Sequence, residues 1–283
     1  MAVALTRERL ETQFGEPIFA LEMRRFGKRA LWSMIVLGVL MGAGTTVAVW
    51  FCPDAEAGRV ALVVSAAVYM FVITAVTPAF GARSITRERD SGTWDMLSIT
   101  RMKSGHIADQ KILSAAMPML VLLVAGMPAA VIGTATGGVS VFEAAGIGIT
   151  LVLATLVVSA WSVETSSDCG SGAIAVAVAY APLASSICLL GYLVSLAVLV
   201  TALVALINRA TRARAWRVVA SGFCLQFGQG ACVLPMLLLV GRYFPSASTP
   251  ALWWLPCAVL VQVLMLLTMR FILARSIERQ RRV

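Results

Sequence analysis

Long apolar segments alternate with short polar segments along this chain of 283 residues. Each apolar segment approaches or exceeds the roughly 20 residues that a helix needs to cross a bilayer, and few charged residues interrupt it. The pattern predicts an all-α fold, a polytopic transmembrane helical bundle. The expected spans are 30–51, 60–81, 112–135, 144–163, two within 172–208, 218–240 and 251–273.

The number of spans depends mainly on residues 172–208, which are 37 consecutive positions without a charged side chain. Because one spanning helix needs about 20 residues, we expect two short spans here and eight in total. The alternative is a single, strongly tilted helix here together with a re-entrant segment among the two preceding spans, which gives six. A short polar loop is expected at 164–171, and it separates the two arrangements, because it lies inside with eight spans and outside with six.

Composition and charge agree with a membrane protein. The chain is 59% hydrophobic and 13% charged, with a mean hydropathy of +0.88, well beyond the usage of a soluble domain. The net charge of +9 does not indicate nucleic acid, because 21 of the 23 lysine and arginine residues lie in 1–29, 82–111, 208–217 and 270–283, all cytoplasmic with eight spans. We therefore expect a multi-pass protein of the cell inner membrane with both termini cytoplasmic.

The same pattern divides the chain into five parts. In the first part, Phe19, Met23 and Phe26 share one helical stripe, which predicts an amphipathic interfacial helix; the alternative is an ordinary solvated helix. The parts are a cytoplasmic N-terminal segment in 1–29, spans one and two in 30–81, a cytoplasmic loop in 82–111, the remaining spans in 112–274 and a basic cytoplasmic tail in 275–283.

Two expected spans carry residues suited to contacts between helices. Gly38 and Gly42 form a GxxxG pattern in the first span, which permits close helix approach. Gln226 and Gln229 lie on one face of the seventh span, and a buried amide needs a partner in lipid. They either line a polar path through the membrane or hold the bundle together, with Gln262 as a candidate partner.

Several kinds of chemistry are excluded by the residues present. The single histidine, His106, excludes histidine-based metal sites and a serine–histidine triad. The six cysteines form no CxxC pair, and no phosphate-binding GxxxxGK[ST] loop occurs. We expect no enzymatic activity, no metal and no cofactor in this chain. The central spans lack acidic, basic and histidine side chains, which argues against an ion-coupled secondary carrier.

The polar interval Arg83–Lys111 is the longest between two long apolar segments, and it carries six basic and four acidic residues. Residues 84–90 predict a helix that continues out of the preceding span. Gly92 predicts its end, since glycine tolerates the backbone angles that terminate helices. Ser104 predicts the start of a further helix that runs into the next apolar segment.

This interval resembles a motif of a known family. Residues 88–97 read ERDSGTWDML, and with Thr100 and Lys111 they resemble the ER-x-x-GT-x-x-x-L…T…GK loop of ABC-2-type transporter permeases. The sequence departs from that pattern at Gln110, where the family often has glycine.

A second segment resembles the same family. Residues 16–24, EPIFALEMR, followed by Arg29, resemble the NP-[IV]-x-x-x-E-x-R segment that precedes the first span in these permeases. Glu16 stands where asparagine is usual. The two motifs occur in the family's order, and the resemblance covers about residues 15–190.

The resemblance implies the permease subunit of an ATP-driven transporter of the exporting kind. The family usually has a six-span core. In the family this loop holds a coupling helix that docks on a separate ABC ATPase subunit, which binds the ATP. The implied coupling residues are Arg87, Glu88, Arg89, Gly92, Thr93, Leu97 and Lys111, and those of the interfacial helix are Pro17, Glu22 and Arg24. The implied partners are the ATPase and a second permease, as a homodimer or heterodimer, within the lipid membrane and without nucleic acid.

Two other functions are compatible with the residues. A membrane-anchored interaction or assembly protein would use the loop charges for topology or for a partner that is not an ATPase. A secondary carrier would draw on an ion gradient instead of ATP. The sequence does not name a substrate.

Overall fold

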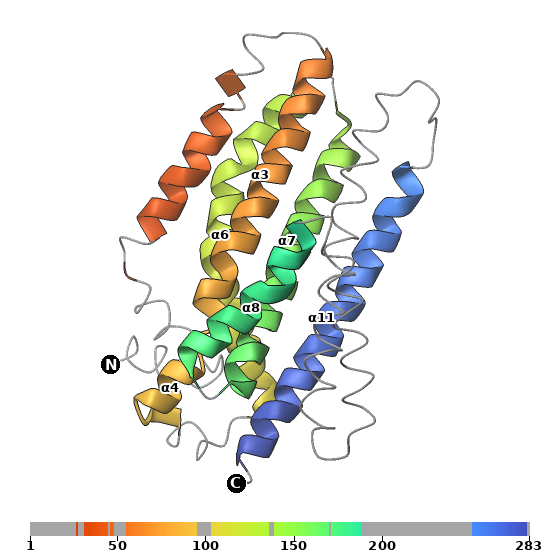
Figure 1. Ribbon diagram of the computed structural model, residues 1–283. Helices are drawn as coiled ribbons and strands as arrows, with labels where there is room; N and C mark the ends of the chain where they lie inside the picture. The colour runs from red at the N-terminus through yellow and green to blue at the C-terminus, as the bar shows by residue number, and fades with distance from the viewer. Residues whose placement is uncertain are drawn as a thin grey trace, which may run out of the picture.

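The computed structural model describes residues 27, 31–44, 46–47, 55–94, 103–135, 139–169, 171–187 and 251–281. Regular structure in this part of the chain is helical, without strands, which confirms the all-α prediction. The labelled helices are α3 (Ala55–Gly81), α4 (Thr86–Asp90), α6 (Ser104–Ala135), α7 (Val141–Asp168), α8 (Gly172–Ile187) and α11 (Ala251–Arg281) (Figure 1). A further apolar helix covers Leu31–Gly44.

Four of the described helices are long and apolar enough to cross a membrane, namely α3, α6, α7 and α11. They contain the spans expected at 60–81, 112–135, 144–163 and 251–273, and each extends beyond its span at one end or both. Of the segment 172–208, in which two spans are expected, the described residues include only α8, and the span expected at 218–240 lies outside them. The total of eight therefore stays a prediction.

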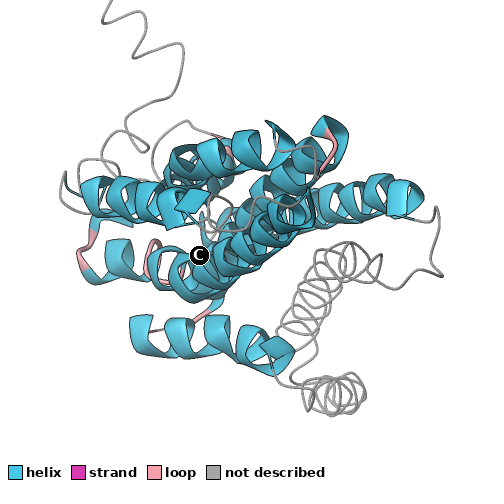
Figure 2. Ribbon diagram, turned by 90° about the horizontal axis from the view of Figure 1, so that it is seen from above, coloured by secondary structure: helices cyan, strands magenta, loops and turns pink. Residues whose placement is uncertain are grey.

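Helix α7 is the centre of the described bundle. It packs against α3, α6, α8 and α11, and the four long helices run side by side along the long dimension of the molecule (Figures 1 and 2). One apolar cluster lies between α3, α6 and α7, and a second joins α6, α7 and α11. The first includes Tyr69, Ile73, Met119, Leu122 and Leu151, and the second includes Ile107, Ile112, Trp161, Met269 and Leu273.

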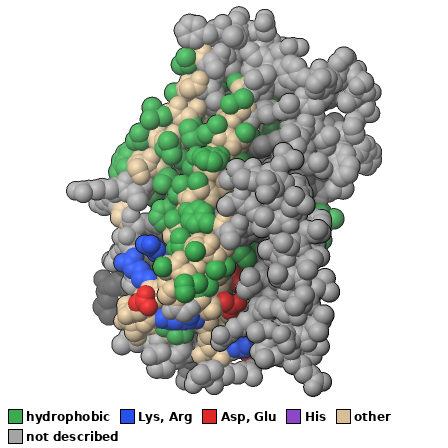
Figure 3. Space-filling view, viewed as in Figure 1, with side chains coloured by type: hydrophobic (Ala, Val, Ile, Leu, Met, Phe, Trp, Pro, Cys, Tyr) green, Lys and Arg blue, Asp and Glu red, His purple; other side chains and the backbone are tan. Residues whose placement is uncertain are grey.

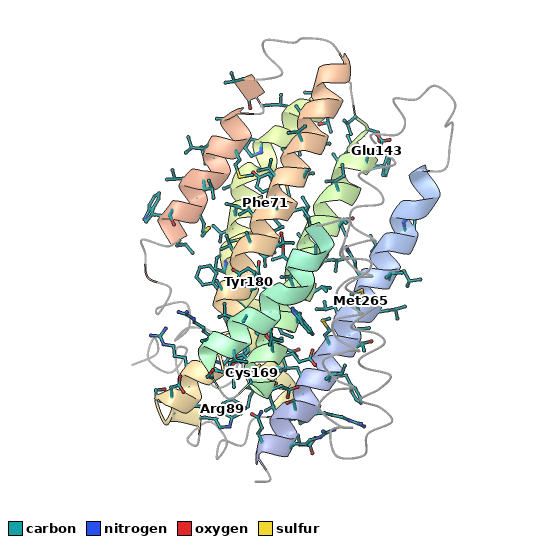
Figure 4. All side chains as sticks on the ribbon, viewed as in Figure 1. Phe71, Arg89, Glu143, Cys169, Tyr180 and Met265 are labelled. Carbon is teal, nitrogen blue, oxygen red and sulfur yellow. The ribbon has the colours of Figure 1, made fainter. Side chains whose placement is uncertain are left out.

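Large apolar side chains also cover the outer faces of these helices. Phe71 on α3 is 60% exposed, whereas Met265 on α11 is buried, and both are labelled in Figure 4. Helices that are apolar on their inner and outer faces alike are typical of membrane spans, because lipid accepts the outer face.

Glycine allows the helix Leu31–Gly44 to approach α6 closely. A Cβ atom at Gly38 would lie only 2.7 Å from the carbonyl oxygen of Leu122, and one at Gly42 would touch Gly126. The Tyr69 hydroxyl of α3 also reaches the carbonyl oxygen of Gly38, at 3.4 Å. The close approach predicted from the GxxxG pattern is therefore confirmed.

The predicted polar loop at 164–171 is wrong over most of its length, because α7 continues as a helix to Asp168. The polar side chains there bond within the helix: Thr165 donates to the Ser162 carbonyl and Ser167 to the Glu164 carbonyl, each at 2.8 Å. Neighbouring elements then bury this end of α7. Tertiary contacts thus outweigh the polar composition that suggested a loop.

Candidate functional site

The start of α4 is fixed to α7 through a close contact and two hydrogen bonds. A Cβ atom at Gly81, the last residue of α3, would overlap the Ser162 side chain of α7, so only glycine fits there. After a short turn, the backbone N–H groups of Ile85 and Thr86 both donate to Ser166 Oγ, at 3.0 and 3.1 Å. The chain therefore leaves α3 in a direction set by α7.

A buried ion pair attaches α4 to α6. Lys111 Nζ donates to Glu88 Oε1 at 2.6 Å, and the two side chains are 0% and 3% exposed. The Glu88 carbonyl also accepts hydrogen bonds from the hydroxyls of Ser91 and Thr93, which close the end of α4. Removal of either charged partner would leave the other charge buried, so this pair holds α4 firmly once it has formed.

Arg89 caps the carboxyl end of α7. Its Nη2 donates to the Ser167 carbonyl at 2.7 Å, and its Nη1 donates to the Cys169 carbonyl at 3.2 Å. Figure 4 shows Arg89 on α4 near Cys169. The last carbonyls of a helix lack partners within it and carry partial negative charge, so a guanidinium there is stabilising. The same guanidinium lies 5.9 Å from the ring centroid of Trp94.

Helix α11 reaches the same end of α7. Gln280 Nε2 donates to the Ser167 carbonyl at 2.8 Å. Ser276 Oγ donates to Asp168 Oδ1 at 3.1 Å, and it also lies 3.1 Å from Ser167 Oγ. The carboxyl end of α7 is therefore a junction between α4 and α11.

A second connection joins α11 to α6. Arg270 Nη2 donates to Asp109 Oδ2 at 2.7 Å, and Arg270 Nε donates to Asp109 Oδ1 at 2.5 Å. The two side chains are 49% and 40% exposed. The two-point geometry orients the helices, but solvent screening limits such an exposed pair to about 1 kcal/mol.

The opposite face of α4 points outward. Arg83, Arg87, Asp90 and the residues 91–93 are exposed. Gly92 has a φ of 69°, and a Cβ atom there would meet nothing within 4 Å. The helix ends as predicted before this glycine, because its left-handed backbone suits glycine. In Figure 3 the charged side chains on the visible face gather at one end, below an apolar surface.

The junction also perturbs one thiol. Burial raises the pKa of Cys169, the neighbouring Asp168 carboxylate raises it further, and the Arg89 guanidinium opposes them. Cys169 is a free cysteine that is partly buried. Its thiol is therefore protonated at neutral pH.

The structure brings six of the ten residues implied as coupling or interfacial residues into one site, but on two faces. Glu88, Arg89 and Lys111 point inward, and Arg87, Gly92 and Thr93 lie on the exposed side. The others lie outside the described residues, as do the two glutamines of the expected polar path. These are Pro17, Glu22, Arg24, Leu97, Gln226 and Gln229.

The residues that form the junction at the carboxyl end of α7 were not among the predicted site residues. Ser166, Ser167, Ser276 and Gln280 make the junction, yet the first two were assigned to a loop and the last two to a tail. The available signal was the run of hydroxyls and carboxylates in 164–168 that directly follows an apolar helix. Such a run is compatible with a solvated loop and equally with a helix end that other elements cover.

Comparison with known proteins adds no further identification: no family model matches the chain, and no curated protein matches it. The likeness to a transporter family therefore depends on the two sequence motifs.

Proposed function

We propose that this chain is the permease subunit of an ABC-2-type, ATP-driven transporter, an exporter with eight spans in the inner membrane and cytoplasmic termini. A separate ATPase subunit hydrolyses the ATP, and two permease chains form the membrane pathway. The observation that carries the proposal is the attachment of α4, a short polar helix that buried bonds hold rigidly at one end of an apolar bundle.

Rigid attachment is what a coupling element needs. A partner that moves α4 transfers that movement only if α4 cannot slide or unfold against the bundle. The buried Glu88–Lys111 pair and the Arg89 cap connect α4 to α6 and α7. Breaking a buried pair typically costs about 3–5 kcal/mol. A displacement of α4 that supplies less free energy than this moves α4 and the bundle together.

The exposed face and the buried face of α4 have different roles. Arg87, Gly92 and Thr93 lie on the exposed face and contact the ATPase. Glu88, Arg89 and Lys111 face the bundle and transmit the movement. Two exposed arginines, Arg83 and Arg87, outnumber the exposed Asp90 on this surface and make it basic. We therefore expect acidic side chains on the ATPase groove that receives it.

The test is co-purification of this chain with any stand-alone ABC ATPase that a neighbouring gene encodes. Arg87→Glu reverses one charge on the exposed face without touching a buried contact, and it is expected to lower ATPase recovery at least tenfold. Arg279→Glu is the matched control, since Arg279 is an exposed arginine on α11. Glu88→Lys is less suitable, because it places two lysine charges together in a buried site and destabilises the chain itself.

The outcomes separate the candidate functions. Recovery of the ATPase with the wild type and the Arg279 variant, but not with the Arg87 variant, supports the permease. No ATPase with any of the three contradicts it and favours an interaction or assembly protein. Transport that persists without ATP and stops when the ion gradient is removed favours a secondary carrier.

A further inference from the structure

One backbone oxygen of α7 accepts side-chain donors from two different elements. Arg89 Nη2 of α4 lies 2.7 Å from the Ser167 carbonyl oxygen, and Gln280 Nε2 of α11 lies 2.8 Å from it. A carbonyl oxygen has two lone pairs, so this one is fully used. The donors are 78 and 113 residues from Ser167 in sequence, and the fold brings both to the same atom.

We propose that the carboxyl end of α7, Ser166–Cys169, is a relay that transmits a displacement of α4 to the carboxyl end of α11. The inference takes the source of that displacement from the proposed function. The coupling between α4 and α11 is a property of this chain alone, and it can be measured without a partner.

Polar and apolar contacts follow the same route. On the polar side, Ser166 binds the start of α4, and Ser276 of α11 binds Asp168. On the apolar side, Ile85 and Trp94 belong to the same buried cluster as Leu273 and Ile277 of α11. Burial strengthens hydrogen bonds by lowering the local dielectric constant. A displacement of α4 is therefore transmitted to α11 through these contacts.

The other route from α4 to α11 is weaker. It passes through the buried Glu88–Lys111 pair into α6 and then through the Asp109–Arg270 pair into α11. That second pair is half exposed, and solvent screens it. The α7 route has a fully buried hydrogen bond at each of its steps, from the start of α4 to Ser166 and between Ser167 and Ser276, so we assign the transmission to α7.

Hydrogen exchange of the full chain in nanodiscs of phosphatidylethanolamine and phosphatidylglycerol tests the relay. Arg89→Gln removes the charged donor from α4 and does not touch a described residue of α11. Loss of a charge-assisted bond corresponds to roughly tenfold in an opening equilibrium, so amides in 277–281 should exchange about tenfold faster. Arg87→Gln, an exposed position on the same helix, should leave them unchanged.

The reverse experiment keeps the test decisive if the Arg89 variant does not fold. Coupling between two sites is reciprocal, so Gln280→Ala should speed exchange in the α4 segment 86–92, whereas Arg279→Gln should not. Exchange that speeds up only on the mutated side, in either experiment, overturns the relay. Failure of the proposed function has a different signature, because an ATPase that never co-purifies leaves these exchange rates untouched.

Discussion

The two ends of α7 are capped in different ways. At the amino end, Ser140 Oγ accepts the Glu143 N–H at 3.2 Å, and Glu143 Oε2 accepts the Ser140 N–H at 3.0 Å. This capping box comes from residues three apart, and the adjacent Phe142 is 85% exposed. At the carboxyl end, residues 157–167 are buried, and the caps are Arg89 and Gln280 from distant elements.

One end of α7 is therefore autonomous, and the other is conditional on neighbouring helices. A helix end that its own neighbours cap keeps its structure whatever the rest of the bundle does. An end that other helices cap is ordered only while those helices stay in place, so it responds to their movement. We therefore expect damage at the amino end to stay local and damage at the carboxyl end to spread.

The largest effect is expected from breaking the ion pair that seats α4 on the bundle. Lys111→Met removes the ammonium group that pairs with the buried Glu88 carboxylate, which should lower the free energy of unfolding by about 3–5 kcal/mol. Reversible unfolding of the purified chain by steric trapping in bicelles measures this change. Glu88→Leu should have an effect of similar size.

The double variant Glu88→Leu/Lys111→Met completes the cycle. Replacement of a whole buried pair by apolar side chains of similar volume is often close to neutral. The double variant should therefore recover most of the lost stability. Additive losses from the two single changes would show that the residues do not stabilise each other.

A smaller effect is expected from the cap at the conditional end. Arg89→Gln removes a charged donor from the carbonyls of Ser167 and Cys169, and hydrogen bonds to charged groups contribute about 1.5–3 kcal/mol. The same unfolding assay should report a loss in that range. A loss below about 0.5 kcal/mol would mean that water replaces the guanidinium without cost.

The autonomous end should show a still smaller effect. Ser140→Ala removes the side-chain acceptor of the capping box, and loss of an N-cap costs about 1 kcal/mol. Hydrogen exchange should speed up in residues 141–145 and stay unchanged in 164–169. Faster exchange at both ends would contradict the contrast between them. Ser140→Thr, which keeps a capping hydroxyl, serves as the control.

The smallest effect concerns the Cys169 thiol beside the cap. Burial and Asp168 raise its pKa, and a raised thiol pKa means less reactive thiolate at neutral pH. With the other five cysteines replaced by alanine, its alkylation rate should rise with pH at a midpoint above that of a free thiol. Asp168→Asn should lower the midpoint while it retains an acceptor for Ser276. An unchanged or higher midpoint would remove Asp168 as a cause.

The apolar pattern predicted the four long helices of the described residues, because a helix that can cross a membrane needs a long, uninterrupted apolar segment. It also located the end of α4, because glycine readily adopts the positive φ that Gly92 has there. The motif singled out Glu88 and Lys111 together, although nothing in the sequence indicated that they form a buried pair.

The junction could not be predicted for a physical reason. Two of its acceptors are the backbone carbonyls of Ser167 and Cys169, and any residue type provides a carbonyl. Their donors come from α4 and α11, which only the packed bundle brings together. The sequence marked 164–168 as polar, and polarity alone does not tell a solvated loop from a buried helix end.

The most direct test of the account is site-specific photo-crosslinking from the exposed face of α4 in cells. A photoreactive amino acid at position 87 should form an adduct with a separate chain that mass spectrometry identifies as an ABC ATPase, and the same amino acid at position 279 on α11 should not. An adduct from position 87 with a protein that has no nucleotide-binding motif, or equal yields of the ATPase adduct from both positions, would contradict α4 as the coupling element.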